Sequence, residues 1–252
     1  MSARSDARGE QTREALIRAA LEIFGRDGFH AASTRAIAGA AGVNQALIGF
    51  HFGGKRGLYL ATFQHVADAI AARMAPLVQS VLAEMEREAD RPGSGAARLR
   101  RYLPLIGRVT DAMVEMFTSE ESRPWARLIL REQQDPGEAF EMSYRRSMGP
   151  VLSGLARLVG GALDRNPEER EVRLLVITII GQALVFRAAS AAVLRQLGSR
   201  RIGEEDVAAI QVLIRRNVAA MLSAARAHRA TGRASQRQQG SAKLSHARER
   251  VE

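Results

Sequence analysis

Apolar side chains recur at helical spacing along nearly the whole chain between residues 10 and 228, and no stretch shows the sustained alternation of a β-strand. The first such segment carries an amphipathic stripe made of Leu16, Ile17, Ala20, Leu21 and Phe24. Apolar residues make up 46% of the 252 residues, which is enough for a sizeable core. The pattern therefore predicts an all-α protein.

Glycine and proline divide this helical chain into a small head and a larger body. Gly28, Gly42 and the pair Gly53-Gly54 end three successive helical segments, so a three-helix unit is expected near the N-terminus. A long helix begins near Lys55, and Pro76 predicts a bend in it. Further helices are expected at about 96–117, 122–133, 137–162, 168–198 and 204–228.

Four regions follow from these breaks. We expect a flexible N-terminal arm at 1–9, a three-helix head at 10–56, a helical body at 57–228 and a disordered basic tail at 229–252. The tail has almost no large apolar residues, and it holds six basic side chains against two acidic ones. A basic tail of this kind can strengthen binding to the phosphates of a nucleic acid, but this contribution does not depend on the base sequence.

The charge balance favours a polyanionic partner. Lys and Arg number 37 against 27 Asp and Glu, which gives a net charge of +10 and points to nucleic acid or an anionic membrane surface. The N-terminus lacks the apolar run of a signal peptide, and the most apolar stretch, 174–186, is too short to span a membrane. We therefore expect a soluble protein in the cytoplasm, associated with the nucleoid and not with a membrane.

Catalytic and cofactor motifs are missing from the sequence. The absence of cysteine excludes disulfides, cysteine-ligated zinc and thiol catalysis, and the histidines do not pair at metal-ligand spacing. The segment 49–56 nearly matches a phosphate-binding P-loop, but Arg56 stands where Ser or Thr is required. We expect neither an enzyme nor a cofactor or bound metal.

The two short segments of the head have the pattern of a helix-turn-helix. Ser33 and Thr34 are suited to cap a helix that runs to Ala41, and Asn44 to cap a second one that runs to about Phe50. The turn between them contains Gly42, which permits a sharp reversal. In such a motif the second short helix enters the major groove of DNA.

The string STRAIAGAAGVNQALIGFHFGGKRGLY at 33–59 resembles the DNA-binding domain of TetR-family transcriptional regulators. The matching residues are Thr34, Ile37, Ala38, Ala41, Gly42, Val43, Ile48, His51, Phe52, Lys55 and Leu58. The second short helix begins with asparagine, as in the CecR-like branch of that family. The segments 123–140 and 181–187 also resemble the effector domain of that branch. Gly49 stands where many members have tyrosine, and Ala46 where glycine is common.

The resemblance implies a set of DNA contacts. Gln45, Ala46, Leu47, Gly49 and His51 would face the groove. Thr34 and Lys55 would hold phosphates, and Arg35 would reach a guanine or the backbone. Ser33 and Asn44, at the helix starts, complete the candidate interface. His51 has an alternative role, packed at the mouth of the long helix.

The resemblance and the amphipathic pattern together predict a homodimer, because heads of this kind read two half-sites of an operator. The candidate interface lies on the last long helices and consists of Ile180, Leu184, Ala188, Ala191, Val207, Ile210, Ile214 and Val218. The alternative is that these helices pack only on their own body.

TetR-like bodies bind a small, usually apolar effector molecule, and the resemblance implies such a site here. Its candidate lining is Met113, Met116, Phe117, Trp125, Leu128, Phe140, Tyr144, Gln182 and Phe186. Methionines and aromatic residues suit an adaptable pocket, although each of these also suits an ordinary core.

These observations predict a homodimeric, sequence-specific regulator that binds a palindromic double-stranded DNA operator and acts as a ligand-responsive repressor. In fold, it is a three-helix head with a helix-turn-helix, followed by a larger all-helical domain for effector binding and dimerisation. Two alternatives remain open: a basic protein that binds DNA without sequence preference, and a helical ligand-binding protein with an inactive head.

Overall fold

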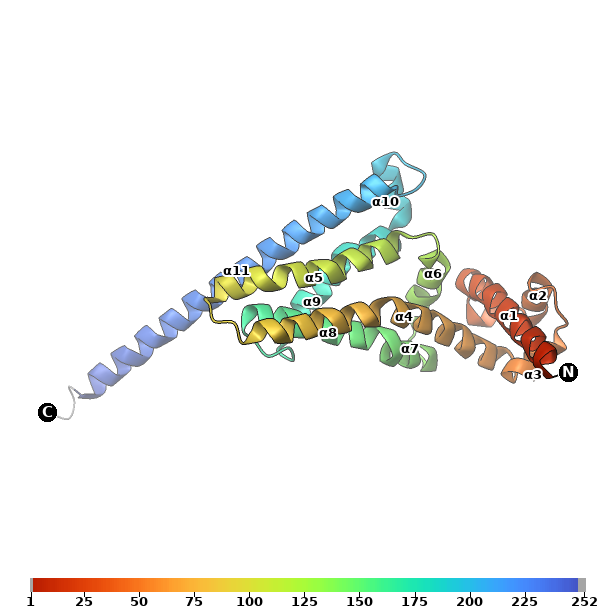
Figure 1. Cartoon of the computed structure of the whole chain (residues 1–252), viewed down its shortest axis with the longest axis horizontal. Coiled ribbons are helices and arrows are strands. Elements are labelled where there is room, and N and C mark those ends of the chain that lie inside the picture. The colour runs from red at the N-terminus through yellow and green to blue at the C-terminus, as the bar shows by residue number, and fades with distance from the viewer. Residues whose placement is uncertain (1, 249–252) are drawn as a thin grey trace.

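The computed structural model describes the backbone of residues 2–248 and the side chains of residues 7–228. Within that part every regular element is a helix, as predicted (Figure 1). The helices are α1 (Ser2–Ala31), α2 (Thr34–Ala40), α3 (Ala46–Phe52), α4 (Lys55–Ala89), α5 (Gly95–Thr118), α6 (Ser122–Glu132), α7 (Glu138–Ser143), the π-helix η1 (Tyr144–Met148), α8 (Gly149–Leu163), α9 (Arg170–Ala188), α10 (Ser190–Leu197) and α11 (Glu204–Arg248).

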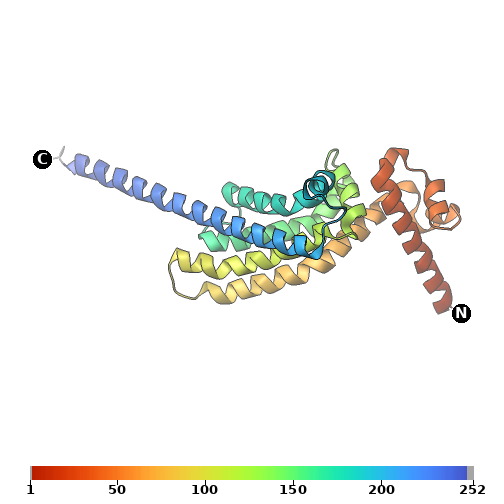
Figure 2. The ribbon, with the colours of Figure 1, turned by 90° about the horizontal axis from the view of Figure 1, so that it is seen from above.

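The head lies at one end of the long axis, and α4 runs from the head into the body (Figure 2). The head consists of α1, α2, α3 and the start of α4. Its core holds fully buried side chains from all four helices, including Phe24, Ile37, Ile48 and Leu58. Gly28 has φ 79° and ψ 172°, so it interrupts α1 at the position where the sequence predicted the helix to end.

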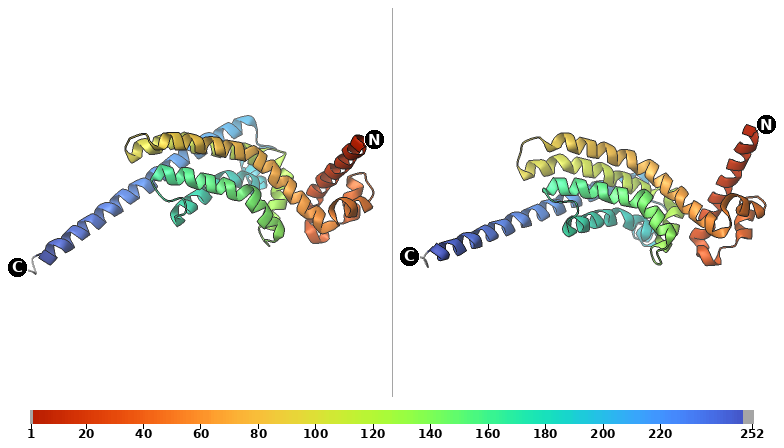
Figure 3. Two further views of the ribbon diagram at one scale, coloured as in Figure 1. Left: turned by 60° about the horizontal axis from the view of Figure 1, so that its bottom comes forward. Right: turned by 90° about the horizontal axis from the view of Figure 1, so that it is seen from below.

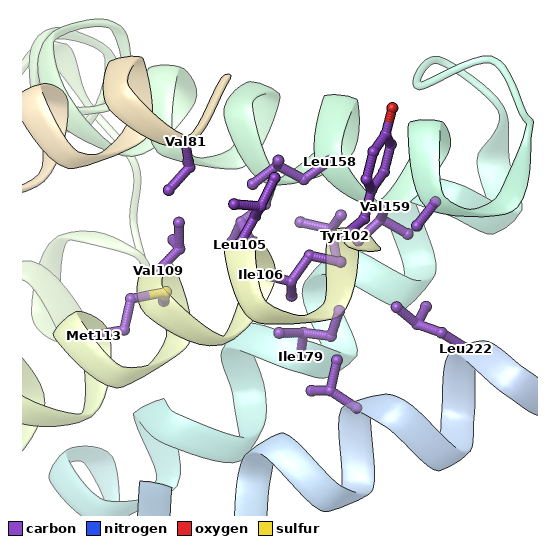
Figure 4. Packing of buried hydrophobic residues seen from close by; sticks show 14 of the residues in the cluster. Val81, Tyr102, Leu105, Ile106, Val109, Met113, Leu158, Val159, Ile179 and Leu222 are labelled. Carbon is purple, nitrogen blue, oxygen red and sulfur yellow. The ribbon is translucent and has the colours of Figure 1, made fainter. Parts of the chain in front are cut away.

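The body is a helical bundle with α5 at its centre. This helix packs against α4, α8, α9 and α11. Figure 4 shows Ile106 of α5 between Leu158 of α8 and Ile179 of α9, with Leu222 of α11 beside them. Because α5 has neighbours on most of its circumference, many of its positions are buried, among them Leu105, Ile106 and Val109.

One helix boundary in the body differs from the predictions, and the bend expected at Pro76 is a smooth curve in a continuous helix. The helix expected at 168–198 breaks at Ala189, where α9 and α10 meet at 76°. No glycine or proline lies there, and the contact that fixes the end of α9 is tertiary: Arg187 is buried, and its guanidinium donates to the carbonyls of Phe117 and Ser119 at the end of α5. In contrast, α4 continues through Pro76 and curves along the body without a break (Figure 3).

The chain ends are more helical than predicted. Helix α1 begins at Ser2, inside the expected flexible arm, and α11 continues through Arg248, inside the expected disordered tail. The segment 229–248 has no proline and is rich in Ala, Arg and Gln, which are good helix formers. The last four residues of the predicted tail, 249–252, lie outside the described part of the chain.

Two described helices, α4 and the 204–228 part of α11, are long and apolar enough to cross a membrane by length and composition alone. In this fold both lie along the bundle and contribute residues to the body core. Asp68 in α4 also pairs with Arg146 of η1. Helix packing therefore accounts for the buried stripe of each of these two helices.

Candidate nucleic-acid interface

Side-chain caps fix the start of both short helices of the head. The Ser33 hydroxyl accepts a hydrogen bond from the Ala36 amide at 3.4 Å, and the Asn44 side chain accepts one from the Ala46 amide at 2.8 Å. Gly42 has φ 68° in the turn between the helices. The predicted helix-turn-helix is therefore present, and it is held by the residues that the sequence indicated.

The starts of α2 and α3 are tied together. Gln45 Nε2 donates to Thr34 Oγ1 at 2.9 Å, although the two residues are eleven positions apart in sequence. Gln45 is exposed, and so are Ser33, Arg35 and Asn44, which are its neighbours or those of Thr34 in sequence. Polar residues from both helix starts thus gather at one edge of the head, where backbone N–H groups favour an anionic partner.

The exposed face of α3 is made of small residues and one large aromatic ring. Ile48 is buried in the head core, whereas Ala46, Gly49 and Phe50 are exposed. Phe50 is 81% exposed, the highest value among the exposed large apolar side chains of the described residues. The sequence analysis missed Phe50, although its position two residues after Ile48 puts it on the opposite face of the helix.

Leu47 and His51 are less accessible than expected for groove-facing residues. Leu47 is half-buried and packs against the head core. His51 is half-buried between aromatic neighbours, with ring centroids at 5.0 Å from Phe50 and 6.1 Å from Phe52. Both roles considered for His51, contact and packing, are compatible with this position.

Lys55 begins α4 and is anchored to the end of α1. Its Nζ donates to the carbonyl oxygen of His30 at 3.0 Å and lies 5.0 Å from the centre of the Phe29 ring. An ammonium group has three protons, so this bond leaves donors for a phosphate. The geometry places a fixed positive charge at the N-terminus of a helix, as the phosphate role requires.

The head also contacts the body through polar groups around Tyr59. Its hydroxyl donates to Glu132 Oε2 at 2.6 Å, while Glu132 Oε1 accepts from the Gly137 amide at 3.1 Å. Burial, together with Glu132, raises the pKa of Tyr59 above its usual value, so the phenol keeps the proton that it donates. Nearby, Arg131 donates to the carbonyl of Arg26 at 3.1 Å.

Comparison with known proteins decides the family. Residues 16–62 match the bacterial regulatory proteins of the tetR family, and residues 104–225 match the C-terminal domain of the HTH-type transcriptional dual regulator CecR. The chain is 33% identical over 198 residues to the HTH-type transcriptional dual regulator CecR of Shigella flexneri, covering 79% of this chain and 85% of that protein. The chain belongs to the TetR family of transcriptional regulators.

A second relative and two solved structures agree with this TetR-family assignment. The HTH-type transcriptional regulatory protein RaaS of Mycobacterium tuberculosis is 49% identical over 179 residues, which cover 69% of this chain and 71% of that protein. A TetR-like regulator from Rhodococcus sp. RHA1 shares the fold with a TM-score of 0.55 at 20% identity, over 82% of this chain and 93% of the other. A putative transcriptional regulator from Pseudomonas aeruginosa PAO1 has the same TM-score at 18% identity, over 85% and 93% of the two chains. The family consists of DNA-binding transcription regulators and not of enzymes.

For a TetR-family dimer, the predicted interface was partly wrong. Ile210, Ile214 and Val218 are buried in the core of their own body. Ile180 and Val207 pack against that same core, Leu184 is half-buried, and only Ala188 and Ala191 are exposed. The residues at 210, 214, 218 and 222 form the stripe that α11 turns inward, so three of the predicted interface residues lie on the buried face of this helix.

The structure places the predicted effector-binding residues in different parts of the molecule. Met113, Met116, Phe117 and Phe186 lie in or against the body core, whereas Trp125 and Leu128 belong to the head core. Phe140 and Tyr144 stack on each other at 5.9 Å between ring centroids, and Tyr144 is exposed. Gln182 accepts a hydrogen bond from Asn217 at 3.2 Å. The predicted lining is therefore divided between two cores and an aromatic pair, because the sequence pattern does not show which core each helix joins.

Proposed function

We propose that this TetR-family regulator is a ligand-responsive repressor that binds a palindromic operator as a homodimer in the cytoplasm. The observation that carries the proposal is an uncovered apolar surface on the body, at a distance from the DNA-binding head. A two-fold dimer joined there presents two copies of α3 to consecutive turns of one DNA duplex, which are about 34–36 Å apart.

The uncovered surface consists of two helix faces. On α9 and α11 the large apolar side chains that remain exposed are Leu174, Ile177, Val185, Val212 and Leu213. Asn217 of α11 donates a hydrogen bond to Gln182 of α9. Asn217 lies one helical turn from Leu213, and Gln182 lies one turn from Val185. The bond therefore sets the two faces side by side. We name these five residues the α9–α11 surface.

The head packs directly on the body, which supports a response to ligand. Trp125 and Leu128 of α6 and Ala139 of α7 are buried in the head core and not in the body core. A small apolar molecule that shifts α6 or α7 therefore also shifts the head. To change the operator from almost fully occupied to almost fully free, the ligand must bind the DNA-free form of the protein more tightly than the DNA-bound form, by on the order of 5 kcal/mol.

Footprinting on the DNA beside the gene, with the ligand-free full-length protein, tests the proposal. We expect protection of a two-fold symmetric site that is lost when one compound of a panel of small apolar molecules is added. Salt-titrated binding to that site and to random DNA then gives the specificity ratio. A ratio near one identifies a sequence-independent DNA-binding protein, and no protection identifies a ligand-binding protein with an inactive head; either result refutes the proposal.

Substitutions in the head separate positioning from sequence reading. Lys55→Ala is expected to weaken binding to operator and random DNA alike and to lower the slope of log affinity against log salt by about one, because one phosphate contact is lost. Gln45→Ala is expected to change which operator is preferred, since its amide can pair with adenine. Thermal melting of each variant controls for lost contacts inside the head. Equal losses on all sequences for Gln45→Ala would contradict its role.

A further inference from the structure

The exposed ring of Phe50 has no packing role that accounts for it. Its neighbour Phe52 is half-buried against the head core, and the Arg13 guanidinium lies 5.6 Å from the centre of the Phe52 ring. Phe50, in contrast, is 81% exposed, and its ring contacts the ring of His51. A single exposed apolar side chain is ordinary on a protein surface, but Phe50 lies on the second helix of a helix-turn-helix, the element that enters the major groove of DNA.

The surroundings of Phe50 let this face of α3 approach its partner closely. Gly49 has no side chain, and a Cβ added there would meet nothing within 4 Å. Ala46, one turn before Phe50, contributes only a methyl group and is exposed. Phe50 is therefore the one large side chain in the middle of the exposed face, and its ring would be the first apolar group to touch whatever α3 enters.

The chemistry of the major groove offers one apolar group to such a ring. Base edges present hydrogen-bond donors and acceptors, which phenylalanine cannot use, and thymine adds a 5-methyl group. Two exposed polar side chains that can bond to base edges lie nearby: Gln45 at the start of the same helix, and Arg35 on α2. Apolar and polar reading groups thus occupy different parts of one surface.

We propose that Phe50 reads the 5-methyl group of a thymine in each operator half-site, and that it supplies the aromatic contact that Gly49 cannot. The inference rests on the proposed operator binding and adds a specificity residue to it. Burying one methyl group is worth about 0.8 kcal/mol, so each such thymine contributes about four-fold to affinity.

The test removes the methyl group and the ring separately. A binding sequence is first selected from a random DNA library with the full-length protein, and each thymine is then replaced in turn by deoxyuridine, which lacks only the 5-methyl group. Fluorescence anisotropy gives the affinity of each duplex. We expect one thymine per half-site whose replacement costs the unsubstituted protein about four-fold. The same replacement should cost Phe50→Ala less than about 1.5-fold, because the methyl group has lost its partner.

Matched variants keep the result specific. Phe50→Leu retains an apolar side chain and should retain most of the deoxyuridine penalty. Gly39→Ala, on α2 and outside the proposed DNA contacts, should leave the penalty in place, because a Cβ there meets nothing within 4 Å. Thermal melting shows that each variant is folded. The proposal is overturned if Phe50→Ala shows the same penalty as the unsubstituted protein, or if no thymine is sensitive. It is also overturned if Phe50→Ala changes the oligomeric state and not DNA affinity.

These outcomes are distinct from failure of the proposed function. If the unsubstituted protein selects no sequence from the library, operator binding itself is refuted, and the thymine contact with it. If it selects a sequence whose affinity does not depend on Phe50, operator binding stands and only the present inference is lost.

Discussion

Gly57 lies in the first turn of α4, where the backbone passes the end of α3. A Cβ placed on Gly57 would lie 1.7 Å from the carbonyl oxygen of Phe52. The contact is with backbone, so no side chain can move aside to relieve it. This residue therefore sets how closely the recognition helix joins the helix that leads to the body.

Gly57→Ala is expected to destabilise the head by about 1–3 kcal/mol, the usual cost of forcing an extra group into a packed site. Gly39→Ala on α2 is the matched control, because a Cβ there meets nothing within 4 Å. In the control, alanine should be neutral or stabilising by up to about 1 kcal/mol, since it favours helix more than glycine does. Urea unfolding of both variants measures the difference. Equal stabilities would show that the end of α3 shifts freely.

At the scale of elements, α6 connects the body to the head. It packs along α1. Glu132 at the end of α6 holds two partners, Tyr59 of α4 and the Gly137 amide before α7. These contacts fix the orientation of the head relative to the body.

Glu132→Ala is expected to loosen the head without unfolding the body. The chain has no cysteine, so spin labels can be placed specifically at the exposed positions Gly39 in the head and Ser153 in the body. We expect a broader distribution of label-to-label distances in Glu132→Ala, because Tyr59 and Gly137 lose their common acceptor. Glu141→Ala, at an exposed position of α7, should leave the distribution unchanged. An unaltered distribution in Glu132→Ala would show that apolar packing alone holds the head.

At the scale of the whole molecule, the head and the C-terminal part of α11 lie at opposite ends of the long axis (Figures 1 and 2). The backbone of residues 229–248 therefore leads away from the DNA that α3 of the same chain would contact. The α9–α11 surface lies between these ends, on the body.

Ile177→Glu is expected to weaken dimerisation at least about 100-fold, because it buries a charge without a partner in an apolar interface. Ile177 is 60% exposed in the described chain, so the substitution should leave the fold of the monomer intact. Ser153→Glu, at an exposed position of α8, is the control. Sedimentation equilibrium measures both variants. A dimer that is as tight in Ile177→Glu as in the unsubstituted protein would place the interface elsewhere.

The sequence by itself determined the helical class and the caps at Ser33 and Asn44, because periodicity and capping are local and act within a few residues. Only the tertiary structure decided the bend at Ala189, which follows from the contact of Arg187 with the end of α5. The same holds for the inward face of α11 and for the division of the predicted effector residues between two cores. An amphipathic pattern shows that a helix has an apolar face, but the partner that covers this face comes from residues distant in the chain.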